Sequence, residues 1–244
     1  MKRFFLFLPA MIFLYSCGIE DYPIIYPIPQ SNITQEMNNR ASVRVPNNYA
    51  GTPFTHFAVF YRIYVSDIPQ ASITENSYSA INPVLSSDYS TFRGYIDSTT
   101  QVNVNMDSLF QGRGYKYLYL QDQNISNILS SAVLGATLVF DFSSSKAPSM
   151  STGGVTYTLW RSDGNGLFNP QPNRLFVNHE DLWKAENIND KTNADVVNKT
   201  GIAEGRRYTY AAMFIAAVGI DTASYSNIYS TPSLIHVFQL PDRW

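Results

Sequence analysis

The sequence predicts an all-β protein, built as an antiparallel β-sandwich. Runs in which apolar and polar residues alternate recur along the chain, and this is the period of a half-buried strand. Aromatic residues make up 14% of the chain and charged residues only 15%, a balance typical of exported β-rich proteins, in which Tyr can occupy both pleated faces. Clusters of Gly, Pro, Asn, Asp and Ser separate the runs and mark turns.

The expected strands follow one another from residue 42 onward. The best patterns predict strands at 42–45, 57–65, 115–120, 136–142, 157–163 and 208–219, with weaker candidates at 92–96 and 102–104. Residues 71–90 are rich in Ser, Asn and Asp and contain Pro83, so we expect mostly loop there, with a short helix near Asp88. Residues 143–154 have small side chains and low complexity, which predicts a connection.

Segments of the second half of the chain resemble segments of the first half, in the same order. The matched positions, in order, are Tyr61 with Tyr157, Gly112 with Gly205, and Val139 with Val237, at offsets of 157 − 61 = 96, 205 − 112 = 93 and 237 − 139 = 98 residues. A period near one hundred residues is that of a small β-sandwich domain. It predicts two tandem repeats, residues 40–143 and 144–244. A single sandwich that shares a strand around 138–142 is the alternative.

The second repeat resembles the C, F and G strands of fibronectin type III domains. The resemblance is carried by Tyr-Thr-Leu-Trp-Arg-Ser-Asp-Gly at 157–164, by the Tyr-x-Tyr strand at 208–219, and by Ser-Thr-Pro-Ser at 230–233. It implies an immunoglobulin-like sandwich whose F strand carries small and apolar residues into the core. The tryptophan that this family usually has on its B strand is absent, so the resemblance covers only part of the repeat.

The first seventeen residues have the form of an export signal. Lys2 and Arg3 precede an apolar run at 4–15, and Ser16-Cys17 closes it. The run is shorter than the roughly 20 apolar residues that a membrane-spanning helix needs. Cys17 is the only cysteine of the chain. A plain secretory signal is the alternative interpretation, because Tyr15 is bulky for its position.

This arrangement resembles the signal of bacterial lipoproteins, and the looser spirochaete consensus tolerates Tyr15. The resemblance implies that residues 1–16 are removed and that Cys17 carries lipid, including acyl chains such as palmitate. It also implies a location in the cell envelope, at the outer membrane in preference to the inner membrane. Residues 17–39 then form a lipidated tether, semi-extended because Pro23 and Pro27 each follow a Tyr. Apolar residues at 24–28 lead us to expect that part of the tether lies against the body.

Charge and motifs exclude several functions. The formal charge is −2, and removal of Lys2 and Arg3 makes it −2 − 2 = −4, which gives no attraction for nucleic acid. The three histidines lie far apart in sequence, so we expect no metal site, and no motif indicates a cofactor. A Gly-x-Ser-x-Gly elbow and a phosphate-binding loop are both missing, so we expect no enzyme activity.

Two features remain as candidate ligand contacts. Asp163 and Asn165 begin a pattern like that of a calcium loop, but Arg174 stands where the EF-hand has Glu, and a tight hairpin turn explains the Asp-Gly and Asn-Gly steps better. Phe168 and Trp183 could stack on a sugar or receive a peptide, and Trp183 is the better surface candidate of the tryptophans considered. The ligand would be a protein or a glycan.

The sequence therefore predicts a membrane-anchored lipoprotein that acts as a binding or adhesion module. Its ligand contacts should lie on loops 68–90 and 163–199, because loops on a rigid sandwich usually carry recognition. A structural subunit of an envelope assembly, paired through an exposed edge strand at 234–240, is the first alternative. A periplasmic enzyme is the second.

Overall fold

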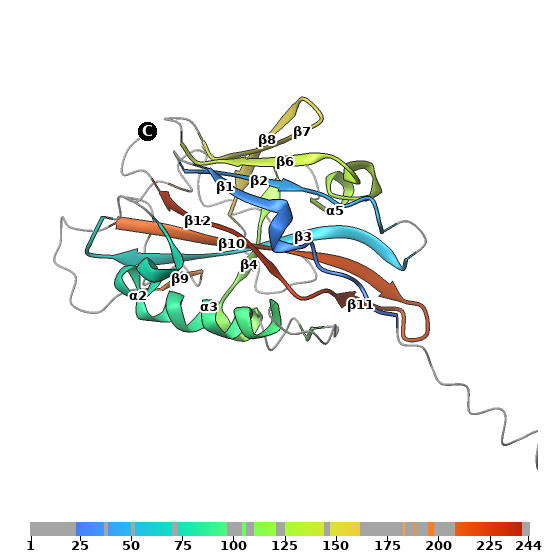
Figure 1. The fold of residues 1–244 in the computed structure, drawn as a ribbon, viewed down its shortest axis with the longest axis horizontal. Helices are drawn as coiled ribbons and strands as arrows, with labels where there is room; N and C mark the ends of the chain where they lie inside the picture. The colour runs from blue at the N-terminus through green and yellow to red at the C-terminus, as the bar shows by residue number, and fades with distance from the viewer. Residues whose placement is uncertain are drawn as a thin grey trace, which may run out of the picture.

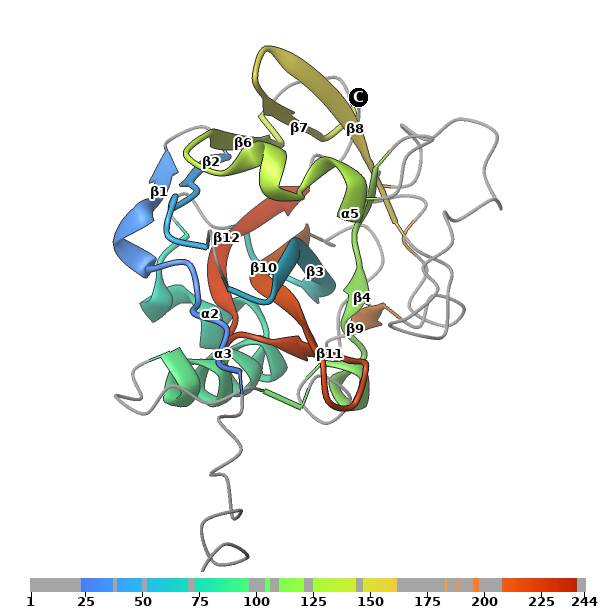
Figure 2. The same cartoon turned by 90° about the vertical axis from the view of Figure 1, so that its right-hand side faces the viewer.

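The computed structural model describes residues 23–36, 39–49, 52–69, 73–96, 104–105, 110–120, 125–143, 147–161, 183, 188, 195–197 and 208–240. These residues form three layers (Figures 1 and 2): an outer sheet, a central sheet, and helices on the far face of the central sheet. Pairing within the sheets is antiparallel except between β3 and β9. The expected all-β, mainly antiparallel class is confirmed.

The outer sheet has the strand order β1-β2-β6-β7-β8-β5. Its strands are β1 (Ile33–Glu36), β2 (Arg40–Arg44), β5 (Tyr119–Leu120), β6 (Thr137–Asp141), β7 (Ser149–Thr152) and β8 (Val155–Trp160). The strands expected at 42–45 and 136–142 are therefore present, and the one expected at 157–163 is present as far as Trp160. The connection expected at 143–154 is wrong in part, because β7 lies within it. Gly153 and Gly154, at φ +57° and +81°, make a tight hairpin turn between β7 and β8 where the sequence predicts a connection without strands.

The central sheet has the order β11-β10-β3-β4, with β12 also paired to β10 and β9 paired to β3. Its strands are β3 (Phe54–Ser66), β4 (Lys116–Tyr117), β9 (Val196–Val197), β10 (Tyr208–Asp221), β11 (Ser226–Tyr229) and β12 (Ser233–Leu240). The long pair β3 and β10 runs in register from Ser66 opposite Tyr208 to Phe54 opposite Gly219. It confirms the two longest predicted strands.

Both faces of this central pair are covered, which explains why their sequences are almost continuously apolar. On β10, Met213 and Ile215 join the core between the two sheets, while Tyr210 and Phe214 join a second core beneath the helices. On β3, Tyr61 lies in the first core and Phe60 in the second. Successive side chains of a strand point to opposite faces, so one run supplies both cores.

The helices lie beneath the central sheet (Figure 1). They include α2 (Tyr78–Ile81) and α3 (Pro83–Ile96), and a further short helix, α5 (Ile125–Ile128), lies beside β3. The 3₁₀ turns are η1 (Gln30–Asn32), η2 (Glu75–Ser77), η3 (Gln111–Arg113) and η4 (Ser131–Val133). Asn82 caps α3 by accepting a hydrogen bond from Val84 N at 2.9 Å, and Pro83 stands at the first helical position, where its missing N–H costs nothing.

The helix expected near Asp88 is confirmed, because Asp88 lies within α3, but two other sequence expectations are wrong in this region. Residues 71–90 are mostly helical where they are described, and 92–96 end α3 instead of forming a strand. Leu85 and Phe92 lie on the face of α3 that packs on the central sheet, where the ring of Phe92 lies 4.6 Å from that of Phe214. Of the other weak candidate, 102–104, only Val104 is described, and it lies outside any strand.

The strand expected at 115–120 is divided between the two sheets. β4 pairs with β3 and β5 pairs with β8, while Leu118 between them donates its N–H to Val59 O at 2.9 Å. The chain thus crosses from the central sheet to the outer sheet within a few residues. This crossing ties the two layers together beside the core.

The described strands do not separate along the predicted boundary at residue 143. β6 precedes this boundary and β7 follows it, yet they pair in the outer sheet, and β3 pairs with β10 across the predicted halves. The two segments that carry the fibronectin type III resemblance became β8 and β10, and they lie in different sheets. β8 pairs with β5 and β7 in the outer sheet, and β10 pairs with β3 in the central sheet.

The N-terminal segment belongs to the body from Ile25 onward. Ile25 and Ile28 are 2% and 1% exposed, and β1 adds a strand to the outer sheet. The expectation that part of the predicted tether packs on the body is confirmed, and the packed part includes Ile25, Ile28 and β1. Residues 17–22 lie outside the described part. Among the described residues, the helices are all too short or too polar to cross a membrane.

Candidate functional site

A buried ionic cluster joins α3 to the central sheet. We call it the Asp88 cluster; its members are Arg62, Tyr64, Asp88, Arg113 and Tyr115. Asp88 Oδ2 accepts hydrogen bonds from Arg62 Nη1 and from Tyr64 OH, both at 2.7 Å, and Oδ1 accepts one from Arg113 Nη1 at 3.2 Å. The hydroxyls of Tyr64 and Tyr115 are 2.7 Å apart. Since the Tyr64 proton goes to Asp88, Tyr115 donates to Tyr64.

Local sequence explains how each side chain reaches this point. Arg62 and Tyr64 both lie on the face of β3 that is directed toward the helices, because residues two apart on a strand share a face. Asp88 lies between Leu85 and Phe92 on the buried face of α3, at helical spacing. Tyr115 follows η3, whose Arg113 completes the cluster.

The cluster places one carboxylate group beside two guanidinium groups. The Asp88 side chain is 3% exposed, whereas those of Arg62 and Arg113 are 16% and 33% exposed, so the positive side of the cluster faces solvent. Burial raises the pKa of Tyr64 and of Tyr115 well above the usual value, and the nearby carboxylate adds to the effect, so both phenols stay neutral donors.

This arrangement anchors α3 on the central sheet. Both oxygens of Asp88 accept hydrogen bonds from side chains of β3 and η3, so the carboxylate links α3 to these elements. Arg62 Nε and Arg113 Nε have no hydrogen-bond partner among the described residues. The cluster contains two guanidinium groups, those of Arg62 and Arg113, and one carboxyl group, that of Asp88.

A second buried ion pair lies between the sheets. Arg161 Nε and Nη2 donate to the two oxygens of Asp195 at 2.9 and 2.7 Å, and both side chains are at most 5% exposed. Burial alone would lower the pKa of Arg161, but the Asp195 carboxylate outweighs it, so the pKa is raised and the group stays charged. Because Asp195 O also accepts from Ile63 N, the pair ties the end of β8 to β3.

Of the predicted ligand contacts, only Trp183 lies in the described part. It is fully buried, and its Nε1 donates to Leu159 O at 2.7 Å. The centre of its ring lies 5.3 Å from that of Tyr61 and 5.5 Å from that of Phe142. The expectation that Trp183 is a surface residue is therefore wrong, because a buried carbonyl satisfies its indole N–H. Cys17, Asp163, Asn165 and Phe168 lie outside the described residues and stay predictions.

The edge strand expected at 234–240 is largely covered. β12 is buried along most of its length. Asn39 accepts a hydrogen bond from Gln239 N at 2.9 Å and donates to Gln239 O, so this side chain occupies the backbone groups of the edge. Nearer the start of the strand, Gln30 Nε2 donates to Leu234 O at 2.9 Å. The N-terminal segment thus blocks the pairing surface that a partner strand would need.

Metal ligands do not gather in the part of the chain that the structure describes: none of its His, Cys, Asp and Glu residues form a group of three that could hold an ion. His56 and His236 are separate and each is largely buried. Burial lowers the pKa of both, that of His236 to about 4, so the imidazoles are neutral at pH 7. Comparisons with protein-family models, curated proteins and solved structures found no match to this chain.

Proposed function

We propose that this chain is a membrane-anchored lipoprotein of the bacterial envelope whose β-rich body acts as a binding or adhesion module. The carrying observation is Cys17, the only cysteine, directly after a short apolar run that follows two basic residues. Two or three acyl chains on one residue hold a soluble body at a membrane, at about 0.8 kcal/mol for each buried methylene. The outer membrane is the proposed location.

The start of the fold supports a short anchor. The described chain begins at Pro23, 23 − 17 = 6 residues after Cys17, and Ile25 is already part of the core. Six residues span about 20 Å when fully extended. The body would therefore be held close to the bilayer instead of on a long stalk.

A protein or glycan ligand remains the proposed partner. The tightly packed cores and the buried ion pairs make a rigid scaffold, and on such scaffolds recognition usually lies in the connecting loops. The predicted contacts Asp163, Asn165 and Phe168 belong to one such connection, that between β8 and β9. The binding module is favoured over the envelope subunit, because the β12 edge on which subunit pairing was based is occupied by Asn39 and Gln30.

A kinship with fibronectin type III domains, and an origin of the two halves by duplication, are retained as proposals. Their support is the preserved order of matched segments at offsets of 93 to 98 residues. A duplication would have been followed by exchange of strands between the halves, since each sheet now draws on both. A set of homologous sequences in which both halves align to each other better than to shuffled chains would test it.

Metabolic labelling tests the anchor. Cells that make the full chain are grown with labelled palmitate, and detergent-phase partition is measured. We expect label and detergent partition for the wild type and for the control Ser16→Ala, which keeps a small residue before the cysteine. Cys17→Ser should lose both. Label that persists in Cys17→Ser would overturn the lipoprotein assignment.

Protease treatment of intact cells then tests display. A displayed binding module is cleaved on intact cells, whereas a periplasmic subunit is cleaved only after the outer membrane is opened. Cleavage only in opened cells would contradict the adhesion role and favour the subunit.

A further inference from the structure

Exposed apolar side chains gather at the end of the body where the described chain begins. The six large apolar residues that are exposed among the described ones are Ile24, Tyr26, Val84, Val155, Ile220 and Tyr225. Four of them, Ile24, Tyr26, Ile220 and Tyr225, form what we call the tether-end patch. Their exposed fractions are 41%, 43%, 39% and 87%. Scattered exposed apolar residues are ordinary, but a group at one end calls for a cause.

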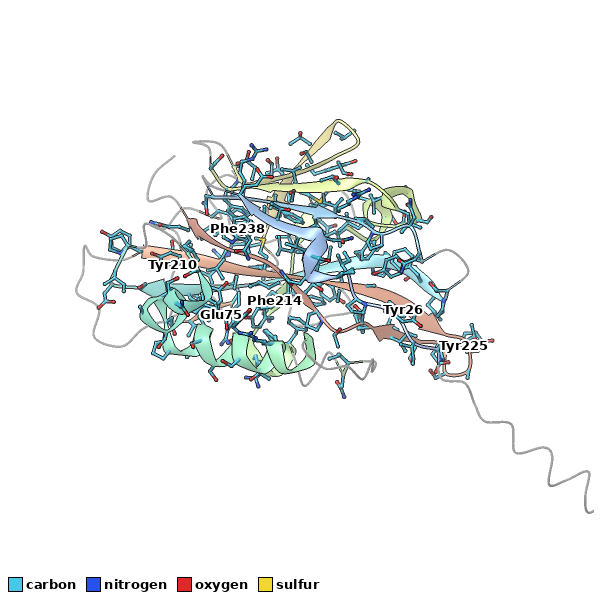
Figure 3. All side chains as sticks on the ribbon, in the orientation of Figure 1. Tyr26, Glu75, Tyr210, Phe214, Tyr225 and Phe238 are labelled. Atoms are coloured by element: carbon cyan, nitrogen blue, oxygen red, sulfur yellow. The ribbon has the colours of Figure 1, made fainter. Side chains whose placement is uncertain are left out.

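Contacts place the two segments of this patch together. Gly219 lies against Ile25 and Pro53: a methyl group on Gly219 would be 2.5 Å from Ile25 Cδ1 and 2.7 Å from the backbone oxygen of Pro53, which shows how closely the N-terminal segment packs here. The next residue, Ile220, donates its N–H to Pro53 O at 3.0 Å. Figure 3 shows Tyr26 and Tyr225 toward the same end of the body, and Figures 1 and 2 show the chain entering the fold there.

The hairpin between β10 and β11 presents Tyr225 in a fixed way. Asp221 accepts hydrogen bonds from Ala223 N at 2.9 Å and from Ser224 Oγ at 2.6 Å, and Ser224 Oγ lies 2.6 Å from Ser226 Oγ. Tyr225 has φ +54°, a conformation that a bulky residue rarely adopts. The turn thus holds a large amphipathic ring out into solvent where burial in the protein would be the usual outcome.

The chain length limits how far this end can lie from a bilayer. If Cys17 carries lipid, the six residues up to Pro23 reach about 20 Å at most. Tyr is enriched at the interface between lipid and water, where its ring meets the headgroup layer and its hydroxyl stays hydrated. Asp221 is the only charged residue at 220–228, so the hairpin has no basic group that would require anionic lipid.

We propose that the tether-end patch lies in the headgroup layer of the same bilayer that holds the lipid anchor, with Tyr225 as its deepest side chain. This inference rests on the proposed lipidation of Cys17 and adds an orientation to it. The anchor and the hairpin together would fix the orientation of the body at the bilayer, and Figure 1 shows the β7–β8 hairpin well apart from the β10–β11 hairpin. The proposed partner is a phospholipid surface.

The test uses the lipidated full chain in phosphatidylcholine vesicles. Because lipid consumes Cys17, an introduced cysteine is the one reactive thiol and can carry an environment-sensitive fluorophore. Ala223→Cys places it beside Tyr225, and Val155→Cys, at a residue 50% exposed on β8, is the matched control. We expect emission at 223 to shift to shorter wavelength and to be quenched several-fold more by headgroup-nitroxide lipid than emission at 155. Adding Tyr225→Ser should reverse this effect at 223 while the protein still floats with vesicles.

The outcomes separate this inference from the anchor. Flotation with water-like emission at both positions would overturn the orientation and leave the anchor standing. Failure of the wild type to float would overturn the anchor and the orientation with it. Protection of position 223 in detergent without vesicles, together with a doubled mass, would show that a second copy covers the patch and would overturn the membrane contact.

Discussion

Asp88 and Arg62 form an ion pair in which Asp88 Oδ2 lies 2.7 Å from Arg62 Nη1, and the Asp88 side chain is 3% exposed. Asp88→Asn removes the negative charge and leaves two guanidinium groups facing one another. We expect a loss of about 3 to 5 kcal/mol in the free energy of unfolding, as for other buried pairs that lose one partner. Denaturant titration of purified protein measures it.

The matched control for this change is Glu75→Gln. Glu75 pairs with Arg93, but both side chains are 48% exposed, so its loss should change stability by about 0 to 1 kcal/mol. Equal effects of the two substitutions would show that the Asp88 cluster does not hold α3 on the sheet.

The second prediction concerns acid stability and His236. Burial lowers the pKa of this imidazole to about 4, below its ordinary 6.5, and its Nδ1 has no partner among the described residues. Between pH 6.5 and 4 the unfolded chain therefore binds a proton that the folded chain refuses. The stability from the neutral imidazole is full above pH 6.5 and falls as the pH drops toward 4, by about 3 kcal/mol.

His236→Phe, which keeps a flat ring of similar shape, should flatten this part of the pH profile. The measurement is the unfolding free energy of both proteins at pH 7 and near pH 4. The remaining slope should include His56, whose pKa is lowered in the same direction. A variant that loses as much stability in acid as the wild type would contradict the assignment.

The third prediction tests the packing under α3. Phe214 is fully buried, and its ring lies 4.6 Å from that of Phe92 and 5.7 Å from that of Tyr115 (Figure 3 labels Phe214). Phe214→Ala should cost about 3 to 5 kcal/mol, the usual effect of removing a large buried aromatic side chain. Tyr225→Ala, at a residue 87% exposed, should change stability by no more than about 0.5 kcal/mol. Melting within a degree or two of wild type for Phe214→Ala would show that the assigned face is wrong.

The long strands could be predicted from the sequence, whereas for the helix beneath them the sequence indicated only a short helix near Asp88 and not its full length. β3 and β10 are long apolar runs, and such runs have few other uses in a chain of this composition. In α3, Leu85 and Phe92 are seven residues apart on one face, but Ser and Asp between them hide the helical period. A count of apolar positions at helical spacing would have found it.

The Asp88 cluster and the strand order depend on contacts that no local pattern reports. Arg62 and Arg113 meet Asp88 from positions 26 and 25 residues away. Likewise, the alternating pattern of β8 indicates a strand but not which sheet it joins. Trp183 was misplaced for a similar reason, since its partner is the backbone carbonyl of Leu159, 24 residues earlier.

The last prediction concerns where the body begins. The sequence predicts a tether that ends at residue 39, but Ile25, Ile28 and Ile33 are all buried in the core between the sheets. Removing them costs about 1.5 to 3 kcal/mol for each side chain, and β1 leaves the outer sheet as well. We expect a fragment that starts at Pro23 to melt cooperatively, and one that starts at Asn39 to melt at a much lower temperature or to aggregate. Circular dichroism during heating compares the two. Equal melting temperatures would show that residues 23–38 contribute little to the fold and would restore the tether to its predicted length.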